Sequence, residues 1–135
     1  DLHASLAPSE MCIRDRPKAN ENVVMNVIGS IEGKDCILVD DIIDTAGTVC
    51  KAADALRKYG ARNIYGCATH GVLSGPAIER IDGSLMEKFV ITDTIALPPE
   101  KHIDKIDVVT VAPILATAIR RVNTDKSISK IFEEA

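Results

Sequence analysis

Three aspartates, followed by two threonines on either side of a glycine, come directly after a short apolar run. This stretch, residues 36–48, reads CILVDDIIDTAGT. Carboxylate oxygens suit hydroxyl groups or Mg²⁺. A tight polar turn that leads into a helix suits an anion such as phosphate, because backbone N–H groups and the helix dipole both point at it. The chemistry indicated is the binding of a phosphorylated, hydroxyl-rich small molecule.

A strand before the acids and a helix after them would position these groups. Residues 36–40 form an apolar run that ends on an acid, which is typical of a buried parallel strand. Residues 41–44 are expected to turn the chain, and a helix is expected over 45–59. In a simpler interpretation, Asp44 or Thr45 merely caps that helix. Capping needs only one polar residue, so three acids plus Thr-x-Gly-Thr favour the binding site.

The chain after this helix predicts an open α/β fold, with a parallel sheet flanked by helices. The apolar run 64–69 would complete a right-handed parallel βαβ unit. Ser74 is expected to cap a short helix. The strand before the acids is expected to be central, beside an edge or antiparallel strand that precedes it. Strands are expected over residues 23–28, 36–40, 64–69, 89–95 and 106–111.

Polar residues are expected at one edge of this sheet, where the carboxyl ends of parallel strands collect ligands. Thr69 and His70 follow one strand, and Thr92, Asp93 and Thr94 end the next. Two interpretations of His70 stay open. It either lies near the site or a subunit contact, or it is a structural histidine bonded to a loop carbonyl.

A helix that opens at Pro113 and a short tail close the sequence. The tail, residues 127–132, carries apolar side chains among polar ones. It is expected either to contact another subunit or to pack onto the domain. The apolar face of the helix consists of Leu115, Ala118, Ile119 and Val122.

Composition places the chain among ordinary globular domains. Apolar residues make up 46% and charged residues 27% of the 135 residues, enough for one domain with a core. A net charge of −4 does not favour a nucleic-acid partner. No apolar run is long enough to span a membrane, and no export signal opens the sequence. The four cysteines lack metal-ligand spacing. A cytoplasmic location is expected.

The first sixteen residues differ from the rest. They show no sustained helical or strand period, and residues 11–16, MCIRDR, resemble a translated sequencing or cloning adapter. We therefore expect residues 1–16 to be a remnant or junction segment, disordered or artefactual, and residues 17–135 to be the folded domain.

Several motifs resemble the ribose-phosphate pyrophosphokinase family, whose C-terminal domain has the phosphoribosyltransferase-type (type I) fold. The loop DDIIDTAGT at 40–48 is similar to that family's phosphoribosyl-binding loop. Asp1-Leu2-His3-Ala4-Ser5 resembles the start of another family signature. The other matching motifs are Lys18-Ala19-Asn20, Gly33-Lys34-Asp35-Cys36, Thr69-His70-Gly71, Ser74-Gly75-Pro76-Ala77, Thr92-Asp93-Thr94-Ile95 and Ala118-Ile119-Arg120-Arg121.

The resemblance implies a ribose-phosphate diphosphokinase, which converts ATP and ribose 5-phosphate into phosphoribosyl pyrophosphate and AMP. Asp44, Thr45, Ala46, Gly47 and Thr48 would then bind the 5-phosphate. The ribose hydroxyls would be held by Asp40 and Asp41, directly or through Mg²⁺. Asp1 and His3 would lie near the magnesium–ATP site. The family also implies a homo-oligomer, a hexamer built from dimers.

The chain departs from the family at its catalytic cations. A mobile loop in the family supplies a lysine and an arginine, and the corresponding positions here are Arg14 and Arg16. Arginine does not substitute freely for lysine, so no catalytic residue is assigned. We expect the chain alone to bind ribose 5-phosphate weakly and to form no product.

Three alternatives stay open: one is a related enzyme, and two belong to a different class. A phosphoribosyltransferase would use phosphoribosyl pyrophosphate as donor on the same fold. A non-catalytic regulatory subunit of the synthetase, or a transcription regulator that senses ligand, would be expected to have lost acids from the loop, and all three acids are present.

Overall fold

The computed structural model describes residues 12–14, 25–27 and 30–133. Asp1, His3 and Arg16, and the expected boundary between residues 16 and 17, lie outside these residues. Strand β1 (Cys12–Arg14) pairs antiparallel with β2 (Met25–Val27) as a separate two-stranded sheet. The expected strand at 23–28 therefore exists in part, but it does not join the main sheet as its edge.

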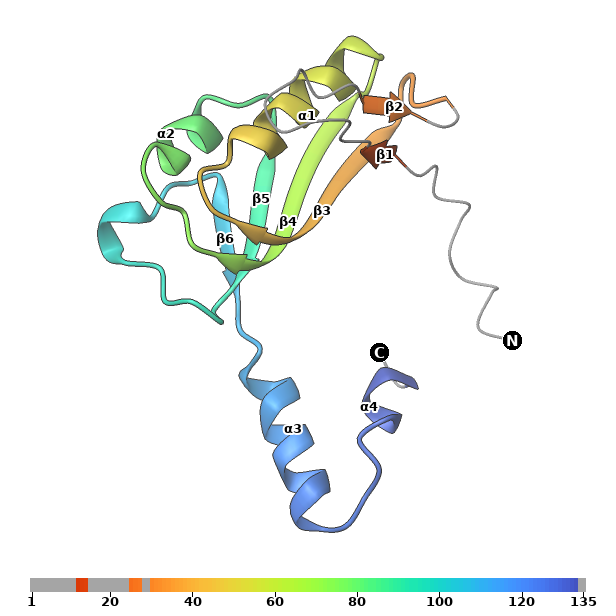
Figure 1. Ribbon diagram of the computed structural model, residues 1–135, viewed down its shortest axis with the longest axis vertical. Helices are drawn as coiled ribbons and strands as arrows, with labels where there is room; N and C mark the ends of the chain where they lie inside the picture. The colour runs from red at the N-terminus through yellow and green to blue at the C-terminus, as the bar shows by residue number, and fades with distance from the viewer. Residues whose placement is uncertain (1–11, 15–24, 28–29, 134–135) are drawn as a thin grey trace.

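The main sheet has four parallel strands in the order β3-β4-β5-β6 (Figure 1). The prediction that the strand at 36–40 is central was wrong, because β3 forms one edge. Ile37 and Val39, 67% and 79% exposed, lie on the face of β3 opposite Cys36 and Leu38, which pack against the core. The strands are β3 (Asp35–Ile43), β4 (Asn63–Gly71), β5 (Lys88–Thr92) and β6 (Ile106–Val109).

Helices α1 (Gly47–Lys58) and α2 (Ala77–Asp82) lie on the same side of this sheet (Figure 1). This follows from right-handed crossovers between strands that advance in one direction across the sheet. Gly60, at φ 88°, ends α1, and the N–H of Ala61 donates to the Leu56 carbonyl at 3.1 Å. Gly60 is the left-handed residue that such a helix end favours. The core between helices and sheet includes Val49, Ala53, Leu56, Ile64, Ala68, Ile81, Phe89 and Ile91.

Close packing in this core requires a glycine on β4. A Cβ at Gly66 would lie 2.4 Å from Cδ2 of Phe89, a separation that real side chains do not tolerate. The absent side chain leaves room for the fully buried Phe89 ring on the neighbouring strand.

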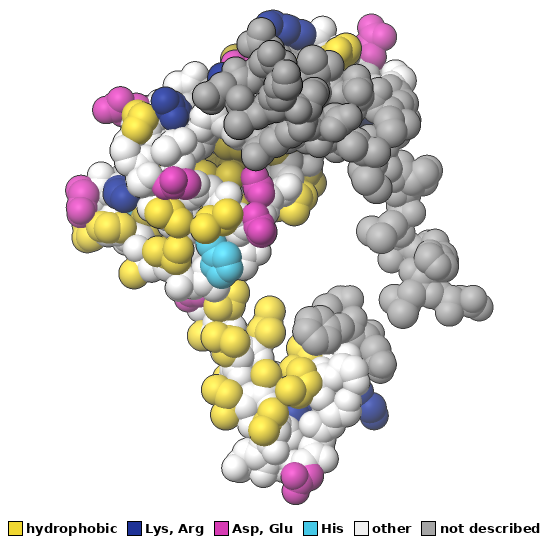
Figure 2. All heavy atoms as spheres, viewed as in Figure 1, with side chains coloured by type: hydrophobic (Ala, Val, Ile, Leu, Met, Phe, Trp, Pro, Cys, Tyr) yellow, Lys and Arg dark blue, Asp and Glu magenta, His cyan; other side chains and the backbone are white. Residues whose placement is uncertain are grey.

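Helix α3 (Ala112–Asn123) extends away from the sheet, and the chain then turns back through α4 (Lys130–Glu133) (Figure 1). The expected apolar stripe is present, but its large side chains are exposed, Ile119 by 69%. Figure 2 shows apolar side chains gathered along this helix. A short 3₁₀ helix, η1 (Pro99–Lys101), precedes β6.

No helix among the described residues is long and apolar enough to cross a membrane. Among the described residues, Cys36, Cys50 and Cys67 form no disulfide.

Candidate functional site

Two of the three aspartates lie on a strand and not in a turn. Strand β3 continues through Ile43, where Ile42 and Ile43 pair with His70 and Gly71 of β4. Because strand side chains alternate between the two faces of a sheet, Asp40 and Asp41 are directed to opposite sides of β3. Both are exposed. The predicted turn over residues 41–44 is thus shorter than expected and begins only at Asp44.

The turn into α1 uses backbone conformation and no side-chain cap. Ala46 precedes the helix with φ 58° and ψ 3°, in the left-handed region, and no side chain caps the helix N-terminus. This conformation costs an alanine roughly 1–2 kcal/mol, so surrounding contacts must hold it. The interpretation of Asp44 or Thr45 as a helix cap was wrong.

Four consecutive carbonyls of this turn are held by neighbouring backbone or side chains. Ile43 O accepts the N–H groups of Val72 and Leu73 at 2.9 and 3.2 Å. The next three acceptors and their donors are Asp44 O from Ser74 N at 2.9 Å, Thr45 O from Arg80 Nη1 at 2.9 Å, and Ala46 O from Cys50 N at 3.1 Å. The N–H groups of Thr45 and Ala46 donate to no other described residue. The turn therefore presents unused donors on the side away from its carbonyl partners.

Ser74 belongs to this turn and does not cap α2. Its hydroxyl donates to the carboxylate of Asp44, and the residue before α2 is Pro76, with no side-chain cap. The prediction that Ser74 caps the short helix was therefore wrong. The same side chain ties the segment after β4 to the last aspartate of the loop.

Hydroxyl groups and one histidine join the carboxyl ends of β4 and β5. The hydroxyls of Thr92 and Thr94 donate to the Thr69 carbonyl at 2.6 and 3.0 Å. His70 Nδ1 lies 2.8 Å from Thr94 Oγ1. The structural interpretation of His70 expected a bond to a loop carbonyl. This was wrong, because the partner of His70 is the Thr94 hydroxyl. As expected, these residues and the aspartates lie where the carboxyl ends of the strands meet.

Asp93, beside these threonines, has a structural partner. Hydrogen bonds from Thr110 and from the Val111 N–H hold the pKa of its carboxyl below the usual value of 3.8.

On α1, burial raises the pKa of the Cys50 thiol, and Asp54 adds to the effect. Cys50 Sγ donates to the Arg80 carbonyl at 3.4 Å, which joins α1 to α2.

The donors present fit a magnesium ion only when substrate completes its shell. Among the described residues, no group of three or more His, Cys, Asp or Glu side chains could hold a metal. Mg²⁺ commonly takes one or two carboxylates and fills its other positions with water and substrate phosphate. Asp40 or Asp41 can supply a carboxylate, but their alternation on β3 does not favour one ion held by both.

A shallow depression exists at the opposite edge of the sheet, where β5 and β6 begin. It lies away from the aspartates, so it takes no part in the site described above. Its lining residues are Lys88, His102, Ile103, Asp104, Ile106 and Asp107.

Comparison with known proteins explains this combination of sheet, loop and helix. The sequence profile of the phosphoribosyl synthetase-associated domain matches residues 6–133. The chain belongs to this family. The match begins at residue 6, inside the segment expected to be a junction, and that expectation stays a prediction.

Relatives of the family are similar over nearly the whole chain. Ribose-phosphate pyrophosphokinase of Caldanaerobacter subterraneus is 59% identical over 126 residues, 93% of this chain and 40% of its own. That of Clostridium acetobutylicum is 53% identical over 133 residues, 98% of this chain and 41% of its own. The chain thus spans about two fifths of the length of these relatives.

A solved structure is similar to this chain in both fold and sequence. Phosphoribosylpyrophosphate synthetase from Mycobacterium smegmatis superposes with a TM-score of 0.72 at 39% identity, over 76% of this chain and 34% of that one. The predicted α/β fold, of the phosphoribosyltransferase type, is confirmed. The site residues remain a hypothesis. The structure places Asp40 to Thr48 together at the β3–α1 junction, whereas Asp1 and His3 lie outside the described residues.

Arg80 is the site residue that sequence reasoning missed. It contacts the loop from α2, 35 residues away in the chain. No short motif marks such a contact, since only the tertiary arrangement of α1 and α2 produces it.

Proposed function

We propose that this chain is the ribose 5-phosphate-binding part of a ribose-phosphate diphosphokinase. In that reaction the 1-hydroxyl oxygen of ribose 5-phosphate bonds to the β-phosphorus of ATP. The bond from that phosphorus to the α,β-bridging oxygen breaks, AMP leaves, and the hydroxyl proton is released. The names of the relatives support a synthetase over a phosphoribosyltransferase.

The observation that carries the proposal is the turn from β3 into α1. Its donors, the N–H groups of Thr45 and Ala46, point away from the groups that hold the Asp44 and Thr45 carbonyls; Thr45 is exposed, whereas Ala46 is 4% exposed. They lie at the positive end of a helix that has no acid in its first turn. A phosphate dianion fits there. The threonine hydroxyls of the loop would add further contacts to it.

Asp40 and Asp41 would take the sugar side of the substrate. Asp40 lies on the same face of β3 as Cys36 and Leu38, which pack against the core below the helices. Its carboxylate would therefore lie nearer the phosphate turn than that of Asp41. Either would contact ribose hydroxyls directly or through Mg²⁺, which supplies charge neutralisation for phosphoryl transfer when bound.

The catalytic cations are the missing part of the proposal. Arg14 lies on β1 and Arg16 outside the described residues, and neither is the lysine of the family. We propose that the 135-residue chain binds ribose 5-phosphate weakly and forms no phosphoribosyl pyrophosphate alone. The hexameric state, the ATP site at Asp1 and His3, and the cytoplasmic location stay predictions.

Calorimetric titration of the chain tests the proposal. Ribose 5-phosphate should bind measurably more tightly than ribose, and Thr45→Val should reduce that difference. Thr117→Val, the same substitution on α3, is the matched control and should not reduce it. Equal binding of the two sugars would contradict the proposal. An assay of AMP release with ATP and ribose 5-phosphate should show no turnover, and turnover would overturn the claim of inactivity.

A further inference from the structure

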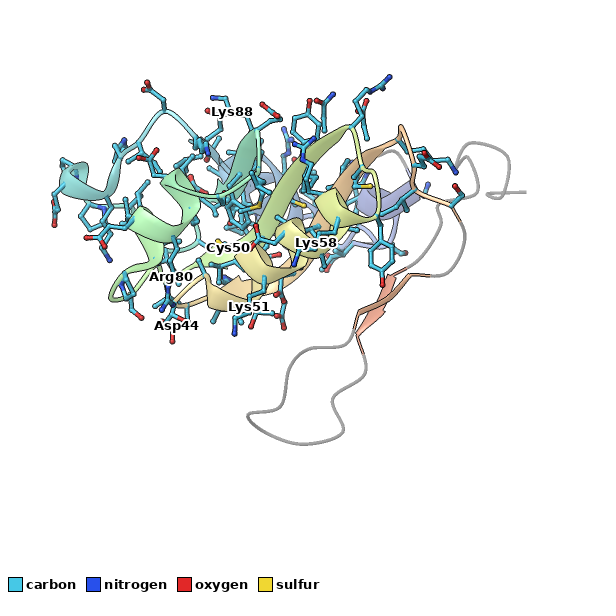
Figure 3. All side chains as sticks on the ribbon, turned by 90° about the horizontal axis from the view of Figure 1, so that it is seen from above. Asp44, Cys50, Lys51, Lys58, Arg80 and Lys88 are labelled. Carbon is cyan, nitrogen blue, oxygen red and sulfur yellow. The ribbon has the colours of Figure 1, made fainter. Side chains whose placement is uncertain are left out.

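Arg80 reaches the proposed phosphate turn from a separate helix. Its Nη1 donates to the Thr45 carbonyl at 2.9 Å. In Figure 3, Arg80 and Asp44 lie at the same end of the domain, away from Lys88. Among the described residues, the guanidinium has no carboxylate partner that would make it an ordinary surface ion pair.

The contact determines where the turn's donors point. A trans peptide is planar, so the Thr45 carbonyl and the Ala46 N–H are directed to opposite sides. Holding the carbonyl toward α2 therefore holds the N–H in the opposite direction, where the phosphate would bind beside the exposed Thr45, although Ala46 itself is only 4% exposed. Ser74 acts in the same way one peptide earlier, because its N–H holds the Asp44 carbonyl at 2.9 Å.

Gly47 leaves the space that Arg80 occupies. A Cβ at Gly47 would lie 3.2 Å from Arg80 Nη1, tighter than an ordinary contact. The residue with positive φ in this turn is Ala46 and not Gly47. Gly47 therefore gives the guanidinium room that an alanine would reduce, and its backbone conformation does not require glycine.

We propose that Arg80 is a positioning residue for the phosphate turn, which holds the Thr45–Ala46 peptide with its N–H directed at the 5-phosphate of the substrate. The inference rests on the proposed function, because it assumes that the turn binds phosphate. Arg80 acts through the backbone and not by direct contact with the ligand.

The test uses ¹⁵N-resolved NMR of the full chain, first without ligand and then titrated with ribose 5-phosphate and with inorganic phosphate. In Arg80→Met, the amide signals of Thr45 and Ala46 should move before any ligand is added, because the peptide is released. Ribose 5-phosphate should then bind about tenfold more weakly, the loss expected for one hydrogen bond made to a charged group. Arg80→Lys, which keeps a donor and the charge, should restore most of the affinity.

A control and a second test variant separate positioning from general damage. Arg57→Met removes a guanidinium that bonds to the Ala61 and Arg62 carbonyls at the other end of α1, and it should leave binding unchanged. Gly47→Ala keeps Arg80 but crowds its guanidinium, so it should weaken binding in the same direction and by less. If Arg80→Met does not fold, Gly47→Ala tests the positioning role in its place.

Each remaining outcome decides the matter. Weak binding in Arg80→Met with unmoved Thr45 and Ala46 amides in the free protein would mean direct contact and overturn positioning. Moved amides with unchanged affinity would overturn it as well. A wild-type chain that binds neither probe would overturn the proposed function itself, and the inference with it.

Discussion

The carboxylate of Asp93 accepts the backbone N–H of Val111 at 2.9 Å. Asp93 follows β5 directly, and Val111 immediately precedes α3. This bond, together with the one from the Asp93 N–H to the Val109 carbonyl at 3.1 Å, holds the point where the chain leaves the sheet. The sequence placed Asp93 where ligands are expected to bind, but its carboxylate forms a hydrogen bond within the fold.

This bond predicts a specific dependence of stability on pH. Hydrogen bonds from Thr110 and Val111 lower the pKa of Asp93 in the folded state, below the value of 3.8 expected when unfolded. The folded state therefore binds fewer protons than the unfolded state near that pH, and the stabilisation is lost as pH falls through the folded pKa. Asp93→Asn should flatten the acid side of a plot of unfolding free energy against pH.

Urea unfolding at a series of pH values from neutral down to below 3.8 measures this slope. Asp104→Asn, an exposed aspartate in the turn before β6, is the control and should leave a steeper slope than Asp93→Asn does. If the two variants lose the same pH dependence, the Asp93 bond does not contribute as described.

The alternation of Asp40 and Asp41 on β3 predicts unequal roles. Asp40 shares a sheet face with the packed side of the strand, so Asp40→Asn should weaken ribose 5-phosphate binding in the presence of Mg²⁺ more than Asp41→Asn does. Titrations with and without Mg²⁺ measure both effects, and Asp54→Asn on α1 serves as the control. Equal losses in the two variants would indicate that both carboxylates contact one ligand or one ion.

Ser74→Ala should loosen the loop without unfolding the domain. The variant removes the hydroxyl that donates to the Asp44 carboxylate but keeps the backbone bond to the Asp44 carbonyl. Because both groups are exposed, the cost should be small, roughly 0.5–1.5 kcal/mol of unfolding free energy. Hydrogen exchange of the Ser74 amide, which donates to the Asp44 carbonyl, should quicken. Ser30→Ala, at another exposed serine, should change neither quantity.

Gly66→Ala should destabilise the core by overpacking. The new methyl group would overlap the Phe89 ring, with Cβ 2.4 Å from Cδ2, and such crowding costs roughly 1–3 kcal/mol or more. Adding Phe89→Leu should recover part of the loss, because leucine leaves the space that the methyl group needs. Thermal and urea unfolding of the single and double variants check this. Strictly additive losses would contradict the proposed overlap.

Much of the fold follows from local patterns. The apolar runs 36–40 and 64–69 and the helix expected over 45–59 predicted a parallel βαβ unit, since each signal depends on neighbours in sequence. The prediction that an acidic, threonine-containing loop follows β3 rests on the same kind of signal. The match of the family profile to residues 6–133 confirmed the family that these motifs indicated.

Tertiary structure decided how the site is held. Whether β3 is an edge or a central strand depends on which strands pair, and hydrophobicity alone does not distinguish the two. The sequence predicted that Ser74 caps α2, whereas in the folded domain its hydroxyl donates to Asp44. Arg80 meets Thr45 only because α1 and α2 lie on one face of the sheet. Sequence placed the groups that suit a phosphorylated sugar, and long-range contacts fix the directions in which those groups point.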